Sequence, residues 1–205
     1  MRYYSHNTVV SQKCFYSLIV TLVSKRMNMD IGTIFLDSAI KRLSNYKLLG
    51  EQTFEQLTGE QMLVQPNEAS NSIAIIIQHL HGNMVSRWTN FLTEDGEKPW
   101  RNRDEEFELQ KLSKEQLMDL WNEGWNVILQ TISSLSVADL GKTINIRSEP
   151  LTVVDAINRQ IAHYSYHVGQ IVFLGKWIRN EDWLSLSIPK KGSEAFNKKM
   201  KGDYK

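Results

Sequence analysis

Four segments of this chain repeat apolar residues at every third or fourth position, which is the period of one buried face of an α-helix. The repeats predict helices at about residues 30–57, from 71 to just before Asp95, at 113–132, and from 151 or 152 to 179. Amphipathic helices of this length bury their apolar faces against one another around one core. We therefore expect an all-α protein, a four-helix bundle, although the periodicity does not give the order in which the helices pack.

Local signals mark where some of these helices begin and where the chain turns. Asp30 is a good N-cap residue for the first helix, and Ser113 begins a capping box of the form Ser-x-x-Gln. Asp95-Gly96 is a turn pair after the second helix. Residues 142–147 alternate between polar and apolar side chains, which predicts a short strand or an extended link.

The composition is that of one ordinary domain. The chain has 205 residues, of which 41% are hydrophobic and 23% charged, so it can bury a core without disulfides or metals as staples. The net charge of +1 gives no overall field that would attract nucleic acid or an anionic membrane, and we expect neither as a partner. A single cysteine excludes a disulfide framework and fits a cytoplasmic protein.

The first part of the chain differs from the rest. Its apolar run at 14–23 is about half as long as a membrane-spanning helix needs to be. Met27 and Met29 stand directly before the first clean amphipathic pattern, and we expect the native start at one of them, with residues 1–26 an over-extended reading frame or a loose arm. The chain is therefore divided into an N-terminal extension at 1–29, a bundle at 30–189 and a lysine-rich tail at 190–205.

Residues 97–112 form a polar segment that contains Pro99 and charges of both signs. A long segment of this composition is usually a solvated loop, and that is the interpretation we favour. The alternative is a lid or pocket wall, because Trp100 and Phe107 within it need a surface on which to pack.

Histidine is the residue type that points to a function. His163 and His167 are four positions apart in the fourth helix, so both imidazoles lie on one face, as two ligands of one divalent ion would. A helical wheel places the pair at the edge of the apolar stripe, where a bundle pocket would open. The same spacing occurs in surface pairs and in hydrogen-bonded core histidines, so two histidines alone do not define a metal site.

A third ligand has to come from another element, and His79 in the second helix is the best candidate. It lies in an isoleucine-rich run at the border between the core and the polar face. His81 projects about 200° away from it, although a helix that is apolar over so much of its circumference separates the two only weakly. Three neutral imidazoles would hold an ion and leave a coordination position open, which is typical of catalytic sites.

Polar side chains beside the histidines are the candidate catalytic residues. The wheel places Arg159 and Gln170 near the pair in the fourth helix. In the second helix, Asn83 and Arg87 lie on the face of His79, and with Arg159 they would orient an anionic co-substrate. Alternatively, each arginine forms an ion pair with a loop carboxylate, since a buried arginine must pair with something. The loop carboxylates considered are Asp104, Glu105 and Glu106.

Several catalytic motifs are absent from the sequence. The residue after His163 is a tyrosine, so the pair is not the HExxH of a metalloprotease, and no Glu-x-x-His pair indicates a di-iron site. No carboxylate base is evident beside the histidines. The only cysteine, Cys14, lies in the N-terminal extension, so a nucleophile would have to be imported as water or a thiol.

Three segments carry a resemblance to a known superfamily. They are NSIAIIIQHLHGNMVSRW at 71–88, DGEKPWRNRDEEF at 95–107 and INRQIAHYSYHVGQIVFLGK at 157–176. With the HxxxHxxQ pattern of His163, His167 and Gln170, they resemble the DinB-like superfamily, and more closely one of its uncharacterised branches, from about residue 30 to 189.

The resemblance implies an up-down-down-up four-helix bundle in which three histidines hold a divalent metal ion, and it implies a homodimer. Carried over by position, the ligands are His79, His163 and His167, and imidazole ligands suit zinc or nickel. The superfamily is named after induction by DNA damage, but a chain this close to neutral gives no support for DNA binding.

The better-understood relatives that this resemblance brings in are transferases and isomerases that use low-molecular-weight thiols such as mycothiol or bacillithiol. It therefore implies a metal-dependent transferase acting on a small molecule, in which the ion lowers the pKa of a thiol and Arg159 holds a carboxylate of that thiol. The alternatives are a metal-dependent hydrolase and a non-enzymatic stress-response or binding protein whose metal site is structural, because a fold does not decide among functions.

Overall fold

The computed structural model describes residues 30–203. The predictions for the N-terminal extension, including Cys14 and a start at Met27 or Met29, lie outside the described residues. The described chain is mostly helical, with one short two-stranded sheet, so the expected all-α class holds in this broad sense. None of the helices within residues 30–203 is long and apolar enough to cross a membrane.

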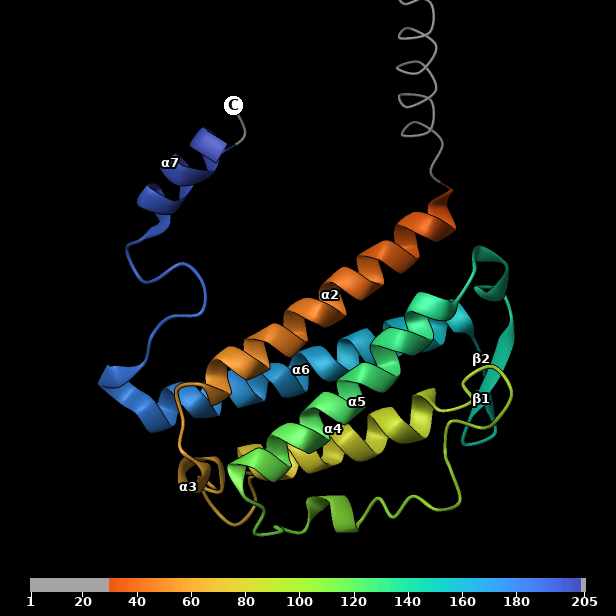
Figure 1. Ribbon diagram of the computed structural model, residues 1–205, viewed down its shortest axis with the longest axis horizontal. Coiled ribbons are helices and arrows are strands. Elements are labelled where there is room, and N and C mark those ends of the chain that lie inside the picture. Colours follow the sequence, from red (N-terminus) through yellow and green to blue (C-terminus); the bar gives the residue numbers. More distant parts are fainter. Residues whose placement is uncertain (1–29, 204–205) are drawn as a thin grey trace, which may run out of the picture.

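Four long helices form the body of the protein (Figure 1). They are α2 (Ile31–Phe54), α4 (Ile73–Trp88), α5 (Lys114–Ser134) and α6 (Val153–Arg179). α2 packs along α6 and α4 packs along α5, and contacts of α2 with α5 and of α4 with α6 join the two pairs around one core. α2 and α6 run in one direction and α4 and α5 in the other, so α4 and α6 are antiparallel neighbours (Figure 1).

Side-chain caps begin three of these helices. Ser72 and Thr152 each accept a hydrogen bond from the backbone N–H three residues further on. The predicted capping box is confirmed, because Ser113 and Gln116 each accept a hydrogen bond from the backbone N–H of the other. Asp30 precedes α2 as expected, but its side chain makes no capping hydrogen bond.

Two helix ends differ from the prediction. α4 ends at Trp88, earlier than expected, because Thr89 is extended and Asn90 is in the left-handed region with a φ of 51°. α6 begins at Val153 because the residues directly before it form a strand.

The connections hold short elements that helical periodicity did not predict. β1 (Thr143–Ile146) pairs antiparallel with β2 (Glu149–Thr152), so the strand or link expected at 142–147 is half of a hairpin. α7 (Ser193–Asp203) occupies most of the region expected as a lysine-rich tail. The remaining short helices are α3 (Gly59–Met62) and the 3-10 helices η1 (Glu105–Phe107), η2 (Val137–Asp139) and η3 (Asn180–Asp182).

The core between the long helices is rich in aromatic side chains next to the polar face of α4. Trp88, Trp125 and Tyr164 are fully buried. The Trp88 indole N–H donates to the Tyr164 hydroxyl at 3.0 Å, and that hydroxyl donates to Asn83 Oδ1 at 3.1 Å. These hydrogen bonds tie α4 to α6 beside the face that carries the histidines.

Candidate metal centre

His79 on α4 and His163 and His167 on α6 converge where the two antiparallel helices pack. One ligand nitrogen from each lies within 4.8 Å of those of the other two. The Nε2 atoms of His79 and His163 are 3.4 Å apart, and His167 has its ring centroid 4.9 Å from that of His79 and 4.8 Å from that of His163. His81 lies outside this cluster and pairs with Glu123 at 3.0 Å. The structure thus brings together the three histidines singled out in the sequence.

Two of the three rings are oriented by hydrogen bonds at Nδ1. His79 Nδ1 is 2.9 Å from Glu106 Oε2, and His167 Nδ1 is 2.9 Å from Gln170 Oε1. An ionised carboxylate oxygen and an amide oxygen only accept, so each Nδ1 carries a proton, and in the neutral form of each ring Nε2 keeps its lone pair. Partners of this kind orient the histidine ligands of metal sites.

The third ring has no such partner. His163 Nδ1 is buried without a hydrogen-bond partner, and Nε2 of the same ring faces His79. Burial, and then the neighbouring His167 and His79, lowers the pKa of His163 to about 3. Burial, and then His79, lowers the pKa of His167 to about 4. Both rings are therefore neutral at pH 7, which is the form that binds a metal ion.

These residues fit a divalent metal ion. Two nitrogen ligands of tetrahedral zinc, each about 2.0–2.1 Å from the ion, lie about 3.4 Å from each other. The Nε2 atoms of His79 and His163 have this separation. Three imidazole donors also form the ligand set of a catalytic zinc site, and nickel accepts imidazole as well.

The residue that holds His79 is Glu106, which the sequence suggested only as a partner of an arginine and not of a histidine. Glu106 lies in η1 and is 8% exposed. Arg101 donates to both of its carboxylate oxygens, at 2.6 and 2.8 Å. Burial alone would raise the pKa of Glu106, but the hydrogen bonds from Arg101 and His79 outweigh burial and lower it, so the carboxylate is ionised. A carboxylate thus lies beside the histidines, but it accepts hydrogen bonds from Arg101 and His79, so the expectation that no carboxylate base is available there stays a prediction.

The segment 97–112 is an exposed loop over most of its length, as we favoured, but it is also a wall of the site, because Arg101, Arg103 and Phe107 line the cavity described below. Lys98 within it is buried, and Phe107 stacks on His79 with ring centroids 4.7 Å apart. Trp100, in contrast, finds little to pack on and is 58% exposed. The buried charges of the segment are paired, Lys98 with Glu94 and Arg101 with Glu106, whereas most of its other side chains are exposed to water.

Gly82 in α4 lets the segment 97–112 pack closely against this helix. A methyl carbon added at Gly82 would lie 2.7 Å from Glu106 Cδ, so any larger residue would meet the carboxylate. A glycine inside a predicted helix is a local signal for such a close approach, and it is the signal through which Glu106 could have been found.

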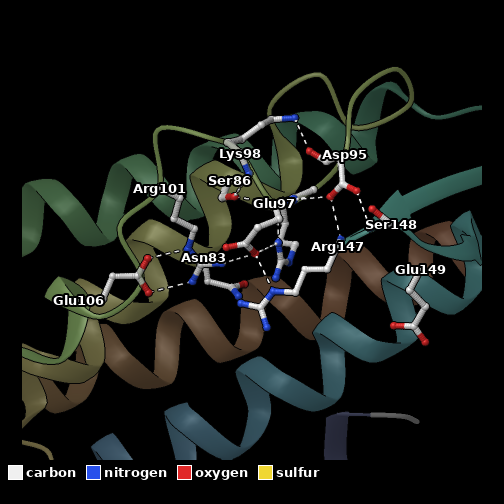
Figure 2. A network of polar contacts seen from close by, with 12 residues as sticks. Asn83, Ser86, Asp95, Glu97, Lys98, Arg101, Glu106, Arg147, Ser148 and Glu149 are labelled. Carbon is white, nitrogen blue, oxygen red and sulfur yellow. Dashed lines mark hydrogen bonds and ion pairs between the residues drawn. The ribbon is translucent and has the colours of Figure 1, made fainter.

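Ion pairs extend from Glu106 across the segment (Figure 2). Arg101 also lies 3.4 Å from Glu97 Oε2. The same oxygen accepts hydrogen bonds from Arg87 at 2.7 Å and from Arg147 at 3.1 Å. Arg87 thus forms an ion pair, the alternative considered for it, but with a carboxylate outside residues 104–106.

Asp95 joins the start of this segment to the turn of the β-hairpin. Its carboxylate accepts the backbone N–H groups of Glu97, Arg147 and Ser148 at 2.7, 2.8 and 2.7 Å (Figure 2). Arg147 and Ser148 have φ values of 55° and 64°, the left-handed conformation of a two-residue hairpin turn. The predicted turn at Asp95-Gly96 therefore also anchors the wall of the site.

Two further residues that were predicted beside the histidines also bind groups other than the histidines. Asn83 lines the cavity described below, but its Oδ1 accepts the Tyr164 hydroxyl. Arg159 is half-exposed and pairs with Glu149 of β2 at 2.9 Å. Arg159 therefore also forms an ion pair, which was the alternative to binding a substrate. Its partner, like that of Arg87, is not one of the carboxylates at 104–106.

A cavity of about 560 Å³ opens over the three histidines, a volume that suits a small molecule. Besides the histidines, its lining includes Asn83, Arg87, Arg101, Arg103, Phe107, Arg147, Arg159, Gln160 and Tyr166. Within the described part of the chain, no cysteine, serine or threonine lines it. The cavity therefore offers ligands for a metal and groups for an anion, but no hydroxyl or thiol nucleophile of these three types.

A protein-family model matches most of the described chain. Residues 30–192 match the family described as "Protein of unknown function (DUF1572)". No curated protein matches the chain. The matched region contains the four long helices, the wall segment and all three histidines, so the whole site lies within it.

Proposed function

The chain belongs to the DUF1572 family, whose function is unknown, and we propose that it binds one divalent metal ion through His79, His163 and His167 and catalyses a transfer reaction with a low-molecular-weight thiol. The observation that carries the metal site is the pair of hydrogen bonds that the histidines donate at Nδ1, from His79 to Glu106 and from His167 to Gln170. They leave the Nε2 lone pairs of both rings available beside the third imidazole. Zinc or nickel suits these ligands.

The proposal includes the DinB-like four-helix bundle with its up-down-down-up arrangement. Its support is the opposite direction of the α2–α6 and α4–α5 pairs (Figure 1). The long connection between the parallel helices α4 and α5 also fits, because a parallel neighbour requires the chain to return along the length of the bundle.

A divalent ion held by the histidines would supply Lewis acidity, which lowers the pKa of a thiol or water that binds to it. The chain contributes neutral rings at His163 and His167, a fixed orientation of His79, and the Phe107 ring that covers His79. The nucleophile comes from the second substrate. Its thiol releases a proton to solvent, and its sulfur forms a bond to an electrophilic carbon as the leaving group departs.

A metal-dependent hydrolase is the alternative, with water as the nucleophile. Water needs a base more than a thiol does, because the pKa of a free thiol is already about 8.5. The carboxylate at the histidines, Glu106, accepts from Arg101 and His79 and so is not free to act as that base. This favours the thiol.

The test is a conjugation assay with a panel of small thiols and an electrophile, run on metal-loaded protein and on His167→Ala. We expect a rate at least ten-fold above the uncatalysed background for one thiol, and background only for the variant. Background rates with every thiol, together with hydrolysis of an ester or amide panel, would assign the hydrolase. Background in both panels with the metal still bound would assign the binding or stress-response protein.

The homodimer and the cytoplasmic location expected earlier stay predictions. The molecular mass in sedimentation equilibrium tests the first, and fractionation of cells that express the native gene tests the second.

A further inference from the structure

The cavity over the histidines has a second, cationic end. The arginines in its lining are Arg87, Arg101, Arg103, Arg147 and Arg159. No aspartate or glutamate among residues 30–203 lines the same cavity. The three carboxylates that pair with these arginines are Glu97, Glu106 and Glu149, which leaves an excess of positive charge. A cavity with such a lining concentrates anions.

The cationic end lies beside the histidines because α4 and α6 are antiparallel. On α4, His79, Asn83 and Arg87 follow one another at four-residue intervals, so the first and last are about 12 Å apart along the helix axis. On α6, Gln160 comes about one turn before His163. One small molecule can therefore reach both ends.

Two buried polar atoms at the cationic end have no hydrogen-bond partner among the described residues. They are Arg87 Nε and Gln160 Oε1, in residues that are 6% and 4% exposed. Both residues line the cavity. A buried donor or acceptor without a partner is costly. A ligand that carries an oxyanion and a polar hydrogen would satisfy both atoms.

The existing ion pairs leave these arginines unsaturated. A single oxygen of Glu97 is shared by Arg87, Arg101 and Arg147. Within the described residues Arg103 makes no ion pair, and its guanidinium carbon lies 4.9 Å from the centroid of the Phe107 ring. That ring stacks on His79, so Arg103 is held over the entrance to the metal centre.

We propose that the small thiol is an anion whose carboxylate or phosphate group binds Arg87 and Arg147, which share one oxygen of Glu97, and whose polar hydrogen binds Gln160 Oε1. The thiol half rests on the proposed function, whereas the anion site does not require the metal. The anion is thereby assigned to these two arginines rather than to Arg159, which is already paired with Glu149 at the rim.

Calorimetry on the metal-free full-length protein tests the anion site with three probes. They are N-acetylcysteine, its amide, which differs only in lacking the carboxylate charge, and inorganic phosphate. We expect the acid to bind about ten-fold more tightly than the amide, because charge-assisted hydrogen bonds form only with the acid. Tighter binding of phosphate than of the acid would identify phosphate as the anion. Equal binding of acid and amide without binding of phosphate overturns the proposal.

Substitutions then locate the site. Arg147→Gln changes an exposed side chain and is expected to weaken binding of the preferred anion by about three-fold or more. Arg87→Gln is expected to weaken it further. Arg42→Gln, on the exposed face of α2, is the matched control and should leave binding unchanged. Unchanged binding in Arg147→Gln overturns the proposal even if Arg87→Gln, which changes a buried side chain, fails to fold.

His163→Ala separates this inference from the proposed function. The variant lacks a metal ligand but keeps the arginines, so in the metal-free state it should retain the preference for acid over amide. A wild-type protein that binds no metal but keeps this preference refutes the proposed function and supports the anion site. A protein that binds metal without the preference refutes the anion site alone.

Discussion

The helical half and the loop half of the metal centre are built in different ways. α4 and α6 supply the three histidines, whose positions follow from the apolar core beside them. The segment 97–112 supplies Glu106, which is held by Arg101 and reaches His79 over Gly82. Helix packing thus places the donor atoms, whereas the electrostatics of an irregular segment decides how one of them is oriented.

The largest effect is expected from filling the space that lets the segment reach α4. In Gly82→Ala the Glu106 carboxylate must move, and Arg101, with a side chain only 2% exposed, loses its bidentate partner. Breaking a buried ion pair costs about 3–5 kcal/mol, against about 1 kcal/mol of helix propensity in favour of alanine. We expect the free energy of unfolding to fall by about 3 kcal/mol in urea denaturation.

Gly169→Ala is the control for this substitution. Its added methyl carbon meets no atom within 4 Å, so only the helix propensity changes, and stability should rise by up to about 1 kcal/mol. If Gly82→Ala were stabilised as much as Gly169→Ala, the position of Glu106 would not depend on its close approach to Gly82.

Glu106→Gln keeps the size of the side chain and removes its charge. We expect zinc affinity to fall about 10–100-fold, as is typical when the partner of a histidine ligand is changed. Glu105→Gln, an exposed neighbour in the same 3-10 helix, should bind zinc like the wild type. Competition with a chromophoric chelator measures the zinc affinity of both variants. Equal affinity in the wild type, Glu106→Gln and Glu105→Gln would show that Glu106 does not support the metal site.

Gln170→Ala deletes the corresponding partner in the helical half. We expect zinc affinity to fall about ten-fold, less than in Glu106→Gln, because the Gln170 amide is neutral and solvent-exposed. The same chelator competition ranks the two variants. A larger loss in Gln170→Ala would reverse the comparison and make the helix the main source of ligand orientation.

The smallest effect is expected at the histidine outside the cluster. His81 pairs with Glu123, whose side chain is 61% exposed, and an exposed pair of this kind contributes little. His81→Ala should change the free energy of unfolding by less than about 0.5 kcal/mol in urea denaturation. A loss above 2 kcal/mol would show that His81 has a structural role like that of the clustered histidines.

Helical periodicity made the helical half predictable. The four-residue spacing of His163 and His167 and the core-edge position of His79 made these three the candidates, and the resemblance to the DinB-like superfamily then pointed to the same residues, which the structure brings together. The capping box at Ser113 was likewise readable, because its chemistry is local.

The loop half could not be predicted in the same way. Glu106 is one of several acidic residues in its segment, and only the tertiary placement of Arg101 and Gly82 distinguishes it from its neighbours. The ion pairs of Arg87 with Glu97 and of Arg159 with Glu149 also depend on where the segment and the hairpin fold. The segment has no periodic apolar pattern, so its sequence does not indicate which of its side chains face the helices and which face solvent.

Elemental analysis of untagged protein tests the central claim most directly, with wild type, His163→Ala and His81→Ala purified in parallel after loading with zinc. Three histidines that form one site predict one ion per chain in the wild type and in His81→Ala, and none in His163→Ala. Equal metal content in His163→Ala and the wild type, or a loss of metal in His81→Ala, would contradict the assignment of the ligands.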